Sequence, residues 1–308
     1  MKRLVKILLA GLFLLVLFRS VGIGALVEQL ENINYLYFSL FLFISLPMIW
    51  ASCMKWALFL DSQVKVISLM RLYTISYFVN LFAPSTIGGD VARSFGLGKK
   101  INNQSKALAA TFFERLTGLL MMLALSAASL IYSKDLLEAF GGYLLIALLF
   151  ALVLGGLFFL HSVRIIMLNI VLKTMGLASG IPGYNKTRAF LESLKEEVSF
   201  SKMVILKSFI WSTVFHGLTI INTYLAGKSI GVQNLDMLSL TAVVPMVLLV
   251  LTIPLTPGGI GVQEGAFVFL LTKVGISSPE ALAISLLLRL KNLILSGIGG
   301  LLLLNKTP

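Results

Sequence analysis

Long apolar runs separated by short polar stretches dominate this chain of 308 residues. A helix rises about 1.5 Å per residue, so about 20 apolar residues are needed to cross the hydrocarbon of a bilayer. Most of the runs approach that length, which predicts transmembrane helices. The apolar segments are Leu4–Phe18, Leu36–Leu60, Leu72–Phe82, Ala107–Tyr132, Gly141–Leu160, Met203–Gly227, Met237–Leu255, Val262–Leu271 and Ala281–Leu304.

Two of these segments are too short to cross a membrane. Leu72–Phe82 and Val262–Leu271 would each cover about half of the hydrocarbon as helices. Each lies beside a break rich in proline and glycine, Pro84 to Asp90 and Pro254 to Glu264. We therefore predict two re-entrant hairpins of broken helices, the second formed by the seventh and eighth segments. Met237–Leu255 alone is long enough to cross, so a second hairpin that spans the membrane is the alternative.

The positions of lysine and arginine support this topology, because cytoplasmic loops are enriched in these residues. With about six full spans, two hairpins and both termini in the cytoplasm, sixteen Lys and Arg fall inside and four fall outside. If every segment crossed, the basic loop 161–202 would lie outside. The sequence thus predicts an all-α polytopic protein of the cell (plasma) membrane, with cytoplasmic N- and C-termini.

The two hairpins also occupy matching places in the chain. Within a single transmembrane domain, 1–308, we predict a first repeat at about 36–132 and a second at about 203–304. Residues 161–202 would form an amphipathic cytoplasmic connection between them. Each repeat runs span, hairpin, span, and the two are inverted relative to the membrane. Inverted repeats with broken helices are the design of many transporters, whose binding site lies near the midplane.

The breaks share a motif of proline, threonine and paired glycines, followed by an acid and then by an arginine inside the next span. Glycine permits positive φ and close approach of a ligand to the backbone. The helix that follows would point N–H donors and a partial positive charge at a phosphate. The helix-break residues are Asn80, Pro84, Gly88 and Gly89 in the first repeat, and Pro254, Pro257, Gly258, Gly259 and Gly261 in the second. Asn80 is expected to bond to carbonyls freed by Pro84.

Charged residues inside apolar segments are the candidate binding residues, because each costs about 2.5–3.5 kcal/mol at the centre of a membrane helix. Glu114 and Arg115 are adjacent on one helix and point in different directions, so each needs a partner on another helix or a cavity. We predict that three arginines hold a phosphate while three acids tune the site or bind a cationic head group. These residues are Arg93, Arg115, Arg289, Asp90, Glu114 and Glu264. Structural ion pairs with Asp90 or Glu264 are the alternative.

The composition of the chain indicates its surroundings and the ligands to expect. With 58% hydrophobic and 12% charged residues, the chain has about half the charge of a soluble domain. We attribute the net charge of +12 to basic cytoplasmic loops that face anionic lipid, and not to a nucleic-acid-binding surface. Cys53 is the sole cysteine, and the two histidines have no metal-ligand spacing, so no metal and no cofactor is expected. Lys55 and Trp56 are interpreted as an interfacial anchor.

Three motifs resemble a known family. They are Asn80-x-x-x-Pro84-x-x-x-Gly88-Gly89-Asp90-x-x-Arg93, Glu114-Arg115-x-x-Gly118, and Pro257-Gly258-Gly259-Ile-Gly261-x-x-Glu264. The chain is similar over nearly its whole length to the lysylphosphatidylglycerol synthase transmembrane region. This is the flippase-like domain of the bacterial multiple peptide resistance factor and of stand-alone relatives. The resemblance implies movement of aminoacylated phosphatidylglycerol, or of lipids linked to polyprenyl phosphate, between leaflets. No soluble synthase domain follows Pro308, so synthase activity is not expected.

Three functions follow from these observations. The first is a lipid flippase or scramblase for an anionic or aminoacylated phospholipid, or a polyprenyl-phosphate-linked lipid. The second is a membrane enzyme acting on lipid phosphates, similar to a glycosyltransferase, although no catalytic constellation is found. The third is a non-transporting partner of a separately encoded lipid synthase or glycosyltransferase. Membrane lipids are the expected partners, and a homo-oligomer is compatible with the sequence.

Overall fold

The computed structural model describes residues 33–60, 64–83, 87–129, 200–253 and 255–305, with single positions at 138, 141–142, 145, 148–149 and 153. Every regular element in these ranges is a helix. The elements are α3 (Tyr35–Phe43), α4 (Ser45–Ala57), α5 (Val66–Phe82), α6 (Ile87–Ile101), α7 (Gln104–Ser129), α11 (Lys202–Ser229), α12 (Met237–Thr252), η3 (Pro257–Gly259), α13 (Val262–Lys273) and α14 (Ser278–Leu304).

Four helices are long and apolar enough to cross a membrane: Tyr35–Ala57, Gln104–Ala128, Lys202–Ser229 and Ser278–Leu304. They coincide with four of the predicted spans, and they confirm that the chain is an all-α membrane protein. The predicted span Leu4–Phe18, nearly all of Gly141–Leu160 and the connection 161–202 up to residue 199 lie outside the described residues. The total number of spans therefore stays a prediction.

The shorter helices form two hairpins. In the first, α5 ends at Phe82, Ala83 is extended, and α6 begins at Ile87. In the second, α12 and α13 are separated by η3. Pro84 and Pro254 themselves lie outside the described residues. Helix α5 begins six residues before the predicted Leu72 and includes Arg71, whose side chain donates hydrogen bonds to carbonyls at the end of α14.

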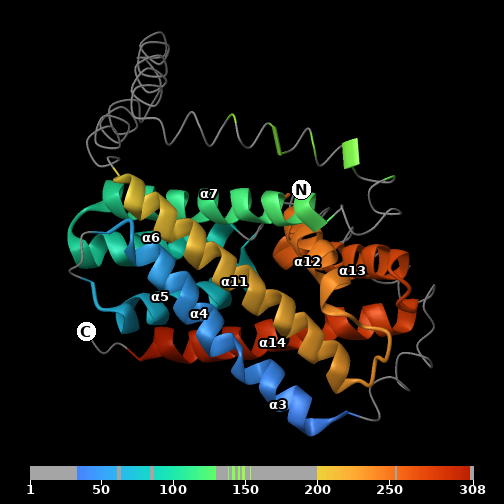
Figure 1. Cartoon of the computed structure of the whole chain (residues 1–308). Helices are drawn as coiled ribbons and strands as arrows, with labels where there is room; N and C mark the ends of the chain where they lie inside the picture. The colour runs from blue at the N-terminus through green and yellow to red at the C-terminus, as the bar shows by residue number, and fades with distance from the viewer. Residues whose placement is uncertain are drawn as a thin grey trace.

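The hairpins enter the helix bundle from opposite ends (Figure 1). At one end, Lys100 near the end of α6 donates to Ser68 near the start of α5 at 2.7 Å. The end of α14 lies there too, through its contacts with Arg71. At the other end, the backbone N–H of Asn34 donates to the carbonyl of Ser229 at 2.7 Å, beside the connection to α12. The first hairpin thus returns to the end from which it starts, and the second begins at the opposite end.

Each hairpin packs against the last long helix of the other half of the chain. Helix α5 lies along α14, and α12 lies along α7. Gly299 makes the first contact possible, because a Cβ there would collide with the carbonyl oxygen of Thr74. The two larger buried apolar clusters of the described residues lie mainly on α4 to α7, and on α3 and α11 to α14.

The two breaks lie beside each other, and they use glycine differently. A Cβ on Gly258 would stand 4.0 Å from the carbonyl oxygen of Asn80. Gly258, Gly259 and Gly261 have φ of 59°, 68° and 82°, as predicted for the second break. Gly89 is instead in the first turn of α6, where a Cβ would stand 2.5 Å from the carbonyl oxygen of Ser76. Gly88 and Gly89 do not use the positive φ that glycine permits; at Gly89 the requirement is close helix packing.

Candidate functional site

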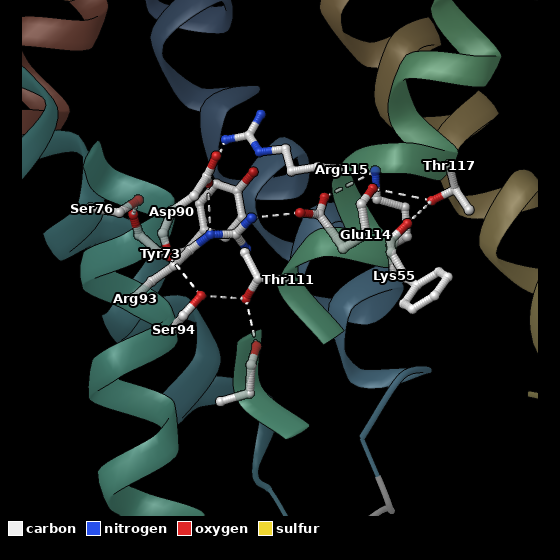
Figure 2. Close-up of polar contacts among 12 residues, drawn as sticks. Lys55, Tyr73, Ser76, Asp90, Arg93, Ser94, Thr111, Glu114, Arg115 and Thr117 are labelled. Atoms are coloured by element: carbon white, nitrogen blue, oxygen red, sulfur yellow. Dashed lines mark hydrogen bonds and ion pairs between the residues drawn. The ribbon is translucent and has the colours of Figure 1, made fainter. Parts of the chain in front are cut away.

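Charged side chains from three helices meet inside the first half of the bundle (Figure 2). We call Lys55, Asp90, Arg93, Glu114 and Arg115 the charged cluster. Lys55 comes from α4, Asp90 and Arg93 come from the first turns of α6, and the last two come from α7. The break before α6 places its first turns at the level of α7 where the adjacent acid and arginine occur. The cluster includes four of the six predicted binding residues.

Glu114 lies at the centre of the charged cluster. One carboxylate oxygen is 2.9 Å from the ammonium nitrogen of Lys55, and the other accepts a hydrogen bond from Arg93 Nη2 at 2.5 Å. All three side chains are buried. A buried carboxylate between two cations is stabilised by both, so Glu114 has the partners on other helices that its position in an apolar span requires.

Arg93 is enclosed on every side. Its guanidinium carbon lies 4.5 Å from the ring centroid of Trp56 and 4.6 Å from that of Tyr73, so the cation is held between two aromatic faces. Its Nε donates to Asp90 at 3.0 Å, besides the bond to Glu114. These contacts make Arg93 the residue that links α4, α5, α6 and α7. Phosphate binding by Arg93 would require them to open.

Arg115 is the accessible cation of the cluster. Its Nη2 donates to Asp90 at 2.6 Å, and its side chain is 53% exposed, against 14% for that of Asp90. Figure 2 shows this guanidinium beside Asp90, on the side of the cluster away from Lys55. Three cations and two carboxylates leave the cluster with one surplus positive charge.

Gly118 and His216 complete the surroundings of Lys55. A Cβ on Gly118 would stand 3.1 Å from the ammonium nitrogen, so the glycine makes room for the lysine. The carbonyl of Gly118 accepts a hydrogen bond from Nε2 of His216 at 3.2 Å. Because a carbonyl only accepts, the proton of this histidine is on Nε2. The third residue of the Glu114-Arg115-x-x-Gly118 motif therefore has a steric role.

Asn80 closes the first break in a way that the sequence did not predict. Its side-chain oxygen accepts a hydrogen bond from the backbone N–H of Gly89 at 2.6 Å. The expectation that Asn80 bonds to carbonyls freed by Pro84 stays a prediction, because Pro84 lies outside the described residues. The bond that the structure does describe satisfies a backbone donor in the first turn of α6, where N–H groups have no partner within the helix. One of the N–H groups predicted to face a phosphate is thus taken up by the protein itself.

The second break has a simpler arrangement. Arg289 binds both oxygens of Glu264, and its Nη2 also donates to the carbonyl of Gly259 at 3.1 Å. The other oxygen contact of Glu264 is with the backbone N–H of Gly261, at 2.7 Å. The pair is neutral and satisfies irregular backbone inside the bundle, as membrane depth requires. In this structure Arg289 stabilises the break, which agrees with the structural alternative named from the sequence.

The two halves repeat one ion pair at the same spacing. Arg115 pairs with Asp90 across 25 positions, and Arg289 pairs with Glu264 across 25 positions. The rest of the charged cluster has no counterpart in the second half. Three positions after Glu264, where Arg93 follows Asp90, the residue is Phe267. One position before Arg289 it is Leu288, and both are buried. The ion pair of Arg289 and Glu264 therefore lacks the added cation and acid that surround its counterpart in the first half.

Two members of the site were misinterpreted from sequence. Lys55 and Trp56 were assigned to the membrane interface, but both are buried beside Glu114 and Arg93. The clue was Glu114 itself, because a carboxylate in an apolar span needs a cation, and Lys55 is the one basic residue within Leu36–Leu60. Tyr73, whose ring contacts Arg93, was also missed.

Comparisons with known proteins agree with the fold and the motifs. Comparison with curated proteins finds no match, and comparison with solved structures finds none either. The family model described as the lysylphosphatidylglycerol synthase TM region matches residues 3–300. This match includes both breaks and all of the helices described above except the last residues of α14. The chain therefore belongs to the lysylphosphatidylglycerol synthase transmembrane region family.

Proposed function

We propose that the protein moves a lipid with a phosphate-containing head group between the leaflets of the cell membrane, as a flippase or scramblase. The charged cluster, with its surplus positive charge at Arg115, is the observation that carries this proposal. The head group would cross at the polar residues, while the lipid tails stay in the bilayer. An anionic or aminoacylated phospholipid and a polyprenyl-phosphate-linked lipid share this chemistry.

The charge balance favours a binding site over a purely structural network. Charges inside a membrane are costly unless they are paired, so a network that only stabilises the fold would be expected to be neutral. The pair of Glu264 and Arg289 meets that expectation, and the charged cluster does not. The surplus lies on the most exposed member, Arg115, whose guanidinium can make two parallel hydrogen bonds to a phosphate.

The arrangement of the hairpins supports transport. Two broken-helix hairpins entering from opposite ends, with breaks in contact and ion pairs at equal spacing, are the features expected of inverted repeats. We propose that both hairpins are re-entrant and that alternating access occurs around the breaks. The end of the bundle with Lys65, Arg71, Lys99 and Lys100 would be cytoplasmic by the positive-inside rule, with both termini on that side.

Leaflet exchange in proteoliposomes tests the proposal. Purified protein is reconstituted with phosphatidylglycerol carrying a fluorescent acyl chain, and the accessible fraction is measured by quenching from outside. We expect exchange with the native protein and its loss with Arg115→Ala. Lys273→Ala, which removes an exposed lysine at the end of α13, is the matched control and should exchange normally.

The same preparation separates the alternatives. Chemical conversion of an added lipid phosphate without exchange would indicate a membrane enzyme. Absence of both, together with stable binding to a separately encoded synthase or glycosyltransferase, would indicate a non-transporting partner. Absence of exchange for phosphatidylglycerol, its lysyl ester and a polyprenyl phosphate would overturn the transport proposal.

A further inference from the structure

A second buried lysine lies outside the charged cluster. Lys291 is in the middle of α14 and is 7% exposed. Its ammonium nitrogen is 2.7 Å from the side-chain oxygen of Asn222 on α11, and 5.9 Å from the ring centroid of Phe41 on α3. Three helices thus meet at the side-chain nitrogen of one lysine. The transport site proposed above does not use it.

Asn222 is held in one orientation by its second contact. Its side-chain nitrogen donates to the backbone carbonyl of Phe41 at 2.8 Å. A carbonyl accepts and does not donate, so the amide oxygen of Asn222 must face Lys291. That oxygen accepts a hydrogen bond from an ammonium and from a neutral amine alike. The immediate surroundings of Lys291 therefore admit both protonation states.

No carboxylate balances this lysine among the described residues. Glu264, on the neighbouring helix α13, is bound to Arg289. Asp90 and Glu114 belong to the charged cluster. The remaining acids of the described ranges lie elsewhere: Asp236 caps the start of α12, Glu280 caps the start of α14, and Glu138 is exposed.

The other titratable groups on the helices that pack against α14 have their own partners. On α11, His216 donates to Gly118, and Lys228 donates to the carbonyl of Val232. On α5, Arg71 binds carbonyls at the end of α14, and Tyr73 lies against Arg93. These helices and α3 carry seven further titratable side chains, and none of them bonds to Lys291 in the described chain. They are Tyr77, Tyr224, Lys202, Lys207, Lys273, Tyr35 and Tyr37.

The two buried lysines, Lys55 and Lys291, differ in what compensates for their removal from water. Lys55 has a carboxylate at 2.9 Å, which compensates for its removal from water. Lys291 has one amide oxygen and the face of a ring. A buried charge without a counter-charge is costly, and lysine avoids that cost by giving up its proton. Water or an anion that reached the side chain of Lys291 would favour its protonated form.

We propose that Lys291 is a proton-binding site of this protein. When the site between α3, α11 and α14 opens, the neutral amine takes a proton from hydronium, so an O–H bond breaks, an N–H bond forms and a water molecule is left. The ammonium returns that proton to water when the site closes. Lys291 is two residues beyond Arg289, about 3 Å along the axis of α14. A charge change there acts on the helix that holds the second break, which would couple proton movement to lipid movement.

The proton-binding part is tested without any transport. Protein with ¹³C at the Cε position of lysine is titrated from about pH 6 to about pH 10, a range below and around the ordinary lysine pKa. The resonance of Lys291 is assigned by its loss in Lys291→Met. We expect this resonance to titrate reversibly within the range and apart from the exposed lysines. A resonance that titrates together with the exposed lysines overturns the proposal.

The coupling part rests on the proposed function. Leaflet exchange is measured with and without a pH gradient for native protein, Lys291→Met and the control Lys273→Met. We expect the gradient to change the rate for native protein and control, and this response to be lost with Lys291→Met. Native exchange that ignores the gradient overturns coupling and leaves the transport proposal intact. If native protein exchanges no lipid, the transport proposal fails, and the titration alone decides the proton site.

Discussion

The ammonium of Lys55 lies 2.9 Å from a carboxylate oxygen of Glu114, and each side chain is 3% exposed. This contact joins α4 to α7 inside the bundle. Glu114 also binds Arg93, so this one carboxylate interacts with two cations. Asp90 binds Arg93 as well, and it also binds Arg115. The packing of the first half and the charge at Arg115 therefore depend on the same network.

Replacing Glu114 by glutamine should destabilise the fold strongly. The substitution leaves the cations of Lys55 and Arg93 without their shared carboxylate, and breaking a buried pair costs about 3–5 kcal/mol. Thermal unfolding in detergent measures the effect. Glu138→Gln, at an exposed position, is the matched control and should unfold like the native protein. Equal melting temperatures for the two variants would show that the network contributes little.

Gly118→Ala should disturb the contact between Lys55 and Glu114 sterically. The added methyl group would stand 3.1 Å from the ammonium nitrogen of Lys55. Overpacking of this kind costs about 1–3 kcal/mol. Gly217→Ala on α11 is the control, because a Cβ there meets nothing within 4 Å. We expect the melting temperature to fall for the first variant and to stay level or rise for the second.

Replacing Arg289 should lower the stability of the fold much more than replacing Arg115, although both arginines pair with an acid. Arg289→Ala exposes the buried Glu264 without a counter-charge and frees the carbonyls of Gly258 and Gly259, so unfolding should occur at a clearly lower temperature. Arg115→Ala removes a half-exposed side chain and should change stability by about 1 kcal/mol or less.

Lipid exchange completes that comparison. We expect Arg115→Ala to abolish exchange while the protein stays folded. Arg115→Lys should restore only part of the rate, because an ammonium lacks the paired geometry of a guanidinium toward phosphate. Full exchange by folded Arg115→Ala would argue against a phosphate contact at this residue.

The orientation of the hairpins can be tested by labelling single cysteines. Cys53 is buried and small, so Cys53→Ala gives a background without a reactive thiol. Lys100→Cys, at the end of α6, and Lys273→Cys, at the end of α13, lie at opposite ends of the bundle. We expect a membrane-impermeant maleimide to label position 273 from outside intact cells and position 100 only after permeabilisation. Labelling of both from the same side would contradict two hairpins entering from opposite sides.

Much of the helical framework could be predicted from local sequence. Apolar length identified the four long helices, and the run of glycines from Gly258 to Gly261 identified backbone that needs positive φ. These features depend on neighbouring residues and on the thickness of a bilayer. The role of Gly89 could not be predicted in this way, because the requirement for glycine comes from Ser76 and Asn80 across the hairpin and not from its own φ.

By itself, the sequence determined that this protein is a helical membrane protein with two paired breaks, each followed by an acid and an arginine. Hydrophobic length, charge position and glycine content are local properties, so they can be read along the chain. Only the tertiary structure decided which charges meet. In the structure, Lys55 is buried in the core and not at the membrane interface, and Arg93 is enclosed by its partners. Lys291 has no carboxylate partner among the described residues. The physical reason is that a buried charge finds its partner across helices, and helix packing alone sets those distances.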